Sequence, residues 1–253
     1  MRRLIFAAIA LTSLLAALSA AADTAATPAY VTAAMHAPRR AADAPEDAHR
    51  QMAAIMTFTQ AKPGQKVVEL IPADGYWTRV FSGIVGDNGH VYTIWPDGYQ
   101  RYVEGSYMNW QQLVTTRYKN VSLIRDADSD LKVPEQVDLV FTNQNYHDYH
   151  DKFMGPVDMA AFDKKVFDAL KPGGVFVVID NVAPAGSGFA DTDTIHRVDP
   201  EAVKKEVESA GFVFDGSSDV LKNPADSHTL VSYQPPMAGH NDQFIFRFRK
   251  PAR

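Results

Sequence analysis

The stretch VVELIPADGYWT, residues 67–78, decides the fold class, because a short apolar run passes directly into a turn and then into an amphipathic segment. Similar apolar runs recur downstream, separated by amphipathic stretches: HVYTIW (90–95), VSLI (121–124), VDLVFT (137–142) and VFVVID (175–180). Strands that are apolar throughout and alternate with helices are typical of a parallel sheet covered on both faces. The sequence therefore predicts an α/β, doubly wound domain.

The C-terminal part departs from this alternation. PEAVKKEVESAGF (200–212) predicts a helix that starts at Asp199-Pro200 and ends at Gly211. Two strand-like runs follow, FVFDGSSDVL (212–221) and DQFIFRFRK (242–250), with a long polar segment between them. We expect them to form a closing antiparallel hairpin, which gives a mostly parallel, seven-stranded sheet.

The N-terminal segment predicts export. Two arginines precede an apolar run from Leu4 to about Leu18, followed by small residues suited to cleavage after Ala21 or Ala22. The apolar run is shorter than the roughly 20 residues of a membrane-spanning helix, so a cleavable signal peptide at 1–22 is favoured over a stable anchor. The expected location is periplasmic or secreted. Residues 23–44 predict a flexible linker, and residues 45–253 one domain that opens with an amphipathic helix at 45–59.

Composition narrows the function classes. Without Arg2 and Arg3 the chain has 23 basic and 30 acidic residues, a formal charge of −7, and no basic arm, so nucleic acid is not an expected partner. The chain has no cysteine, which excludes disulfides and thiolate chemistry. A small-molecule substrate is the expected partner, and the sequence leaves the oligomeric state open.

An ordered set of motifs resembles the class I S-adenosylmethionine-dependent methyltransferases, in particular exported bacterial proteins of that class. The motifs are PGQKVVELIPADGYWT (63–78), VGDNGHVY (85–92), VDLVFTNQNYHD (137–148), LKPGGVFVVID (170–180) and HRVDP (196–200). The resemblance covers about residues 45–250. It implies a Rossmann-like methyltransferase fold with S-adenosylmethionine as cofactor, although a fold is weaker evidence for an activity.

The cofactor loop departs from the pattern that the resemblance implies. The family's E-x-G-x-G-x-G falls on Glu69, Ile71, Ala73 and Gly75, so the first two glycines are missing. A β-branched residue disfavours positive φ, and Pro72 is expected to push Ile71 into an extended conformation. We therefore expect this loop to follow a different path.

The other cofactor contacts that the resemblance implies are partly kept. Trp95 stands where an acid would bind the ribose, and Asp97 two residues later is the candidate replacement, with a plain turn residue as the alternative. Asp126 and Ala127 follow the third strand, where the family binds adenine. With Glu69 and Gly75, these residues form the predicted cofactor site.

The polar run NQNYHDYHD, residues 143–151, follows the fourth strand directly and is costly to bury without partners. Asn143, Tyr146 and His147 are the candidate catalytic residues, with His147 as a possible general base. Asn143 and Tyr146 resemble the Asn-Pro-Pro-Tyr motif of amino-methylating enzymes, but both prolines are absent. His147 and His150 would share one face of a helical turn and could hold a metal or move a proton. Spacing alone assigns no metal ligand.

Three residues are candidates for substrate binding: His150, His196 and Arg197. Arg197 could clamp an anionic substrate or pair with Asp199, and the preceding segment GSGFADTDT (186–194) could form a lid. The leading hypothesis is an exported methyltransferase of unknown substrate. The alternatives are a non-catalytic binding protein that kept the fold and lost the cofactor, and a metal-dependent hydrolase.

Overall fold

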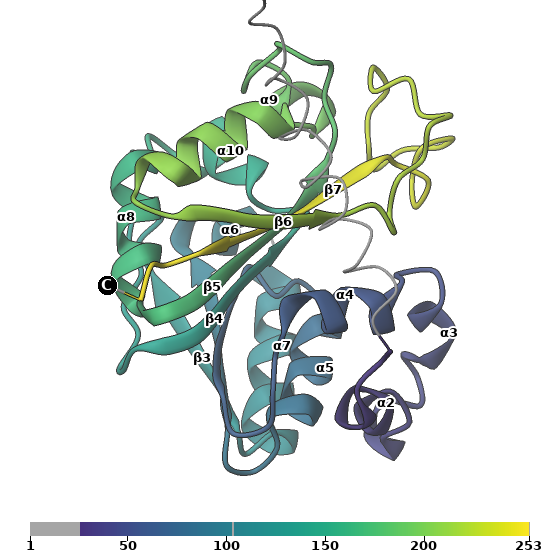
Figure 1. Ribbon diagram of the computed structural model, residues 1–253, viewed down its shortest axis with the longest axis vertical. Helices are drawn as coiled ribbons and strands as arrows, with labels where there is room; N and C mark the ends of the chain where they lie inside the picture. Colours follow the sequence, from purple (N-terminus) through teal and green to yellow (C-terminus); the bar gives the residue numbers. More distant parts are fainter. Residues whose placement is uncertain (1–25, 103, 253) are drawn as a thin grey trace, which may run out of the picture.

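The computed structural model describes residues 26–102 and 104–252, which form one seven-stranded sheet with helices on both faces (Figure 1). The predicted signal peptide at 1–22 lies outside the described residues. The strands are β1 (Lys66–Leu70), β2 (His90–Pro96), β3 (Val121–Asp126), β4 (Val137–Asn143), β5 (Leu170–Asn181), β6 (Val213–Ser218) and β7 (Gln243–Arg249).

The helices of at least six residues are α2 (Ala29–Met35), α4 (Met52–Thr59), α5 (Tyr76–Val85), α6 (Asp97–Tyr102), α7 (Glu104–Arg117), α8 (Met159–Ala169) and α10 (Pro200–Ser209). Shorter helical turns are η1 (Pro38–Arg40), α3 (Ala44–Asp47), η2 (His147–His150), η3 (Lys152–Met154) and α9 (Thr192–Ile195).

The strand order is β3-β2-β1-β4-β5-β7-β6, in which only β7 runs antiparallel to its neighbours. The chain builds outward from β1 to β3 and then returns to the other side of β1 with β4, so the strand order reverses between β1 and β4. Ligands of such sheets bind at the carboxyl ends of the strands near this reversal. The predicted doubly wound sheet with a C-terminal antiparallel hairpin is confirmed.

Two apolar layers hold the helices against the sheet. On one face, α5 buries Val80 and Phe81 against Phe141 of β4, together with side chains from α2, α4 and α7. On the other face, α8 and α10 bury Val166 and Val203 against β4 and β5. Figure 1 shows the same division, with α8 and α10 on one side of the strands and α4, α5 and α7 on the other.

The N-terminal arm, residues 29–50, is where the structure corrects the sequence. A flexible linker was predicted over 23–44, but Val31 and Ala34 of α2 are buried against the core. The buried guanidinium of Arg40 binds Asp47 at 2.7 Å, and the hydroxyl of Tyr76 donates to the same carboxylate at 2.6 Å. The linker prediction failed because two short turns and a buried ion pair, rather than a sustained apolar stripe, hold the arm.

The helix predicted over 45–59 is divided in two. Gln51 adopts a left-handed conformation with φ of 49° and separates α3 from α4. The predicted apolar positions Met52, Ile55, Met56 and Thr59 are all buried, so the expected face of this segment is confirmed even though its continuity is not.

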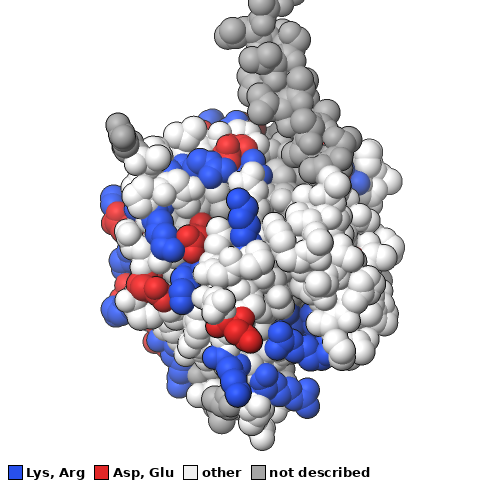
Figure 2. All heavy atoms as spheres, turned by 60° about the horizontal axis from the view of Figure 1, so that its bottom comes forward, with Lys and Arg blue, Asp and Glu red and all other residues white. Residues whose placement is uncertain are grey.

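Figure 2 shows charged side chains of both signs on the left and lower parts of the face in view, with basic groups prevailing along the lower edge. Within the described part of the chain, every helix is too short or too polar to cross a bilayer.

Candidate functional site

The loop after β1 keeps a left-handed backbone at all three predicted glycine positions. Ile71, Ala73 and Gly75 have φ of 51°, 47° and 78°. The prediction that Pro72 makes Ile71 extended is therefore wrong. Ile71 donates its amide to the carbonyl oxygen of Ile94 in β2 at 2.9 Å and buries its side chain in the apolar cluster on the α8 face of the sheet. This packing offsets a backbone conformation that costs a β-branched residue roughly 1–3 kcal/mol.

Gly75 lies directly under an indole. A Cβ atom at this position would lie 1.8 Å from the nearest ring carbon of Trp110, which comes from α7 and is itself buried. The space beside the third glycine position is therefore filled by a side chain of the same protein. A ligand that approaches Gly75 closely requires the Trp110 ring to move.

Glu69 is buried and bound to its own domain. Its carboxyl group forms a short hydrogen bond with the hydroxyl of Thr78 in the first turn of α5. Burial raises the pKa of Glu69 to about 8, while Thr78 and Arg79 act in the opposite direction. At neutral pH this carboxyl group is therefore largely protonated.

At the carboxyl end of β2, Trp95 and Pro96 are buried, and the first accessible polar side chain is that of Asp97. Trp95 is fully buried in the core, where its ring packs 5.7 Å from that of Tyr99. Asp97 is the first residue of α6, is exposed, and accepts one hydrogen bond from Gln100 at 3.2 Å. Asp97 is thus a helix residue rather than the turn residue of the alternative interpretation, and its carboxylate is accessible.

The carboxylate of Asp126 is hydrogen-bonded to backbone amides of the loop that follows β3. It accepts the amide of Ala127 at 3.1 Å and that of Lys132 at 2.6 Å. The neighbouring Asp128 accepts a short hydrogen bond from the amide of Gly98 at the start of α6. The predicted cofactor residues thus lie together at the carboxyl ends of β1, β2 and β3. Most of their polar side-chain atoms, however, already form hydrogen bonds within the protein.

A second polar group lies at the carboxyl ends of β4 and β5. His147, at the start of η2, donates two hydrogen bonds to Asp180 near the end of β5. The backbone amide of His147 donates to one carboxylate oxygen at 2.9 Å, and Nδ1 lies 2.8 Å from the other. Both side chains are buried. Because Nδ1 donates its proton to Asp180, Nε2 of His147 is left as the atom that faces outward from this pair.

Nε2 of His147 faces one group from another segment and one from its own turn, η2. Nδ1 of His196, just after α9, lies 3.1 Å away, and an oxygen of Asp148 lies 3.3 Å away. Asp151 is also buried nearby. No described group forms a hydrogen bond within 3.5 Å to either oxygen of its carboxyl group. The Thr192 hydroxyl is nevertheless near enough to lower the pKa of Asp151. Four side chains thus converge, three from residues 147–151 and that of His196 from the segment after α9.

The electrostatics of this group follow from burial and from the carboxylates. Burial lowers the pKa of His147, but Asp180 and Asp148 outweigh it and raise the pKa to about 9. Burial raises the pKa of Asp148 to about 6. Burial and the nearby His147 lower the pKa of His196. The pKa values of the two imidazoles are therefore shifted in opposite directions, and a proton shared between them is held by His147.

A cavity of about 390 Å³ opens beside these groups, and we call it the histidine cavity. His147, Asp148 and His196 lie at its polar end, and Tyr99, Phe153 and Tyr233 form its aromatic walls. The size and the mixture of aromatic walls with a few convergent polar groups are typical of small-molecule sites.

Tyr146 and His150 lie outside this group, which corrects their predicted roles. The hydroxyl of Tyr146 is buried between Asp163 at 2.8 Å and Glu206 at 2.7 Å. His150 binds Glu206 at 3.0 Å and stacks on Phe189 with ring centroids 3.8 Å apart. The two histidines do not share a site, because Asp180 of β5 holds His147 and Glu206 of α10 holds His150.

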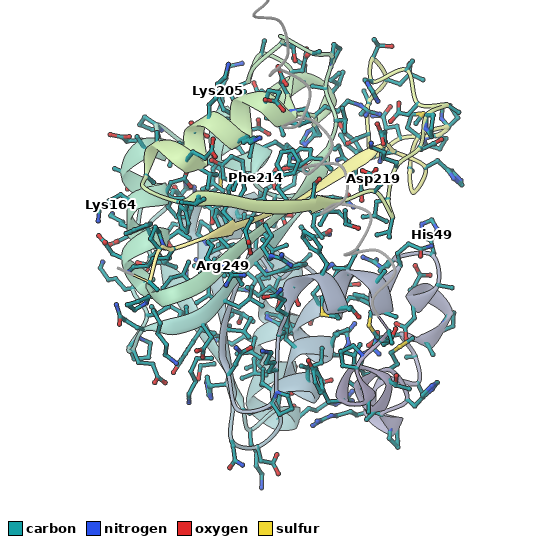
Figure 3. The ribbon with its side chains drawn as sticks, in the orientation of Figure 1. His49, Lys164, Lys205, Phe214, Asp219 and Arg249 are labelled. Carbon is teal, nitrogen blue, oxygen red and sulfur yellow. The ribbon has the colours of Figure 1, made fainter. Side chains whose placement is uncertain are left out.

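Asn143 borders a different hollow, the arm cavity, of about 260 Å³. Its walls come from the N-terminal arm, from Trp77, and from the segment between β6 and β7. Figure 3 labels His49 on the arm, where its ring lies 6.3 Å from that of His240 in the segment opposite. Gln144 borders both cavities, so Asn143 is adjacent to the histidine cavity but not one of its lining residues.

Arg197 is a structural residue, which corrects both predicted roles. Its guanidinium is fully buried and binds Asp226 at 2.9 Å, Val182 O at 2.9 Å and Leu230 O at 2.8 Å. It lines neither the histidine cavity nor the arm cavity, and it does not pair with Asp199, which instead caps α10 by accepting the amide of Glu201. Arg197 therefore fixes the segment between β6 and β7.

Asp180, Asp148 and Asp151 are site residues that were not among those predicted from the sequence. Asp180 had a usable signal, since it is an acid at the carboxyl end of an otherwise apolar strand in VVID. Asp148 and Asp151 were in the polar run but were treated as neighbours of the histidines. That His196 would join His147, 49 residues earlier, had no local signal.

Comparisons with known proteins agree with this fold. No protein-family model matches the chain. The protein-L-isoaspartate O-methyltransferase of Methanothrix thermoacetophila is 27% identical over 144 residues, which are 57% of this chain and 58% of that protein. The match thus spans little more than half of the curated relative.

Solved structures extend the likeness to most of the domain. A SAM-dependent methyltransferase from Aquifex aeolicus superposes with a TM-score of 0.56 at 16% identity, covering 81% of this chain and 93% of that one. The [4+2]-cyclase SpnF gives a TM-score of 0.53 at 16% identity, covering 81% and 82%. The fold is that of the class I S-adenosylmethionine-dependent methyltransferases. The second structure is named for a different reaction, a cyclisation, so the fold alone does not identify the reaction.

Proposed function

We propose that this protein is an S-adenosylmethionine-dependent methyltransferase that acts on a small molecule bound in the histidine cavity. The observation that carries the proposal is the position of that cavity, at the carboxyl ends of β4 and β5 in a methyltransferase fold. The partial match to a curated methyltransferase supports the same reaction class. We further propose, from the N-terminal sequence, that the mature protein acts in the periplasm or outside the cell.

The residues at the β1–β3 edge fit the cofactor in two respects. The loop of Ile71, Ala73 and Gly75 keeps the left-handed path of a glycine loop, and Asp97 presents an accessible carboxylate at the end of β2 for the ribose hydroxyls. Bound S-adenosylmethionine would supply the methyl group. For a close approach to Gly75, the ring of Trp110 has to leave its present position.

At the β4–β5 edge the protein positions the acceptor. Tyr99, Phe153 and Tyr233 offer aromatic surface to an apolar or ring-shaped acceptor. Asp180 fixes the orientation of His147, which with His196 gives the cavity a polar end that can bind the accepting oxygen or nitrogen. Methyl transfer is an in-line displacement, so holding the two reactants in line supplies most of the rate enhancement.

A calorimetric titration of residues 23–253 with S-adenosylmethionine tests the proposal. We expect saturable binding that Asp97→Ala weakens at least tenfold, because the ribose loses its carboxylate partner. Asp87→Ala is the matched control, since Asp87 is also an exposed acid but lies in the turn before β2, at the opposite edge of the sheet. Absence of both heat and thermal stabilisation at millimolar cofactor would overturn the proposal.

A second candidate is a binding protein that has kept the fold without the cofactor. It is favoured by one observation, the indole of Trp110 against Gly75. This candidate predicts that small molecules bind in the histidine cavity while S-adenosylmethionine does not bind, so the same titration separates the two.

A further inference from the structure

We propose that His147, His196, Asp148 and Asp151 form a binding site for a divalent transition-metal ion of the zinc type. One ligand atom from each of the four lies within 4.8 Å of the other three. Two imidazole nitrogens and two carboxylate oxygens are a donor set that zinc accepts. This inference does not rest on the proposed methyl transfer, because it concerns binding of the ion alone.

The separations of three of these atoms match the size of a metal site. Nε2 of His147 lies 3.1 Å from Nδ1 of His196 and 3.3 Å from Oδ1 of Asp148, and the last two atoms are 3.9 Å apart. The circle through three points so placed has a radius of about 2 Å, which is also the length of zinc bonds to imidazole nitrogen and carboxylate oxygen, about 2.0–2.2 Å. One ion can therefore contact all three atoms with little movement.

Asp180 supplies the support that metal-binding histidines ordinarily have. It accepts both the backbone amide and Nδ1 of His147, so Nε2 is the ring atom directed at His196 and Asp148, and an ion that binds there takes the place of the proton on Nε2. A carboxylate that fixes the ring and tautomer of a histidine in this way is typical of zinc sites. Asn145 holds the second oxygen of Asp148 at 3.1 Å, which leaves Oδ1 free to bind the ion.

Asp151 provides an independent indication of a missing ligand. Asp151 is about 1% exposed, and no described residue forms a hydrogen bond within 3.5 Å to either oxygen, although the Thr192 hydroxyl is near enough to lower the pKa of the carboxyl group. A buried carboxylate without such bonds is costly, and a cation beside it removes the cost. Asp151 would be the fourth ligand once its carboxylate turns toward the other three.

The histidine cavity gives the ion an open side. All four ligand residues line this cavity of about 390 Å³, which also reaches Tyr99 and Tyr233. While His147, His196 and Asp148 are the three protein ligands and Asp151 is turned away, the fourth position of an ion there can bind water or an oxygen of a small molecule. An open position of this kind is what distinguishes catalytic from structural zinc sites.

The test is a calorimetric titration of tag-free, EDTA-treated residues 23–253 with zinc chloride, without S-adenosylmethionine. We expect one equivalent to bind with a micromolar or lower Kd. His196→Ala, at the least buried of the four ligands, should weaken binding at least 100-fold. Asp180→Asn should weaken it 10- to 100-fold, because the ring of His147 loses its orienting partner.

The double variant His49→Ala/His240→Ala is the matched control, since it removes the exposed histidine pair at the arm cavity and should leave zinc affinity unchanged. Cobalt-loaded protein should show the visible absorption of a low-coordinate nitrogen–oxygen site, and His196→Ala should lose it. No binding to the wild-type protein, or affinity that falls in the control but not in His196→Ala, would overturn the proposal. Failure of cofactor binding would leave this result unaffected.

Discussion

The carboxyl ends of β1–β3 and those of β4–β5 differ in how their polar groups are used. At the first edge Glu69 is bound by Thr78, Asp126 by two backbone amides, and Gly75 is covered by Trp110. At the second edge Nε2 of His147 and Nδ1 of His196 point at each other beside an open cavity. The first edge keeps the backbone path of a cofactor loop, whereas the second keeps polar atoms that can still bind a ligand.

The largest expected effect concerns the segment that borders the second edge. Arg197→Ala leaves Asp226 buried without its cation, so we expect the free energy of unfolding to fall by about 3–5 kcal/mol. Arg247→Ala is the control, because its partner Asp215 is partly exposed, and should cost clearly less. Urea denaturation measures both. Equal losses would show that the buried pair is not what holds the segment between β6 and β7.

Trp110 covers Gly75 at the first edge, and its removal should change both stability and cofactor affinity. Trp110→Ala removes a buried indole and should lower the free energy of unfolding by about 3 kcal/mol. It also clears the space beside Gly75, so affinity for S-adenosylmethionine should rise about tenfold. Val114→Ala, one turn along α7 and also buried, is the control that loosens the helix without clearing that space. If both variants bind the cofactor like the wild type, Trp110 is not an obstacle.

Glu69 gives the first edge a distinct pH dependence. Its pKa is raised to about 8, so the folded state retains a proton that the unfolded chain releases near its usual pKa of 4.5. Stability should therefore fall as pH rises from about 5 through 8, by up to about 4 kcal/mol, since one unit of pKa shift corresponds to about 1.4 kcal/mol. Thermal unfolding across this range should show a smaller decline in Glu69→Gln than in the exposed control Glu208→Gln. If stability declined with pH equally in both variants, Glu69 would not be the source of the pH dependence.

The smallest expected effect tests the backbone path of the loop. Ala73 is exposed with φ of 47°, so Ala73→Gly should raise the free energy of unfolding by under about 1 kcal/mol. The control Ala160→Gly, at an exposed position inside α8, should lower it by about 0.5–1 kcal/mol. The two substitutions are chemically identical, so opposite signs identify the left-handed conformation. A loss of stability in both would contradict it.

The sequence predicted the sheet well because each strand carries its own signal. The apolar runs at β1 to β5 and the final pair at β6 and β7 lie where they were expected, as does the start of α10 at Asp199-Pro200. The N-terminal arm was missed because it is held by a buried Arg40–Asp47 ion pair and by the hydrogen bond from the distant Tyr76 to Asp47, neither of which gives an apolar periodicity. The conformation of Ile71 was missed because the packing of its side chain outweighs the local preference set by Pro72.

The site could be predicted only in part for a similar reason. The polar run at 143–151 marked the right edge of the sheet, and His147 and His196 were both among the candidates. Which of these residues meet depends on distant partners: Asp180 holds His147, and Glu206 holds Tyr146 and His150 away from the cavity. Residue spacing along the chain contains no information on those partners.

The most direct test of the account follows the histidine ring signals by NMR while residues 23–253 are titrated with S-adenosylmethionine. The account predicts saturable shifts of the His147 and His196 signals, because the methyl donor enters the crevice that these rings border, with no shift of His49 or His240. No shift of any histidine at millimolar cofactor, or shifts confined to His49 and His240, would contradict it.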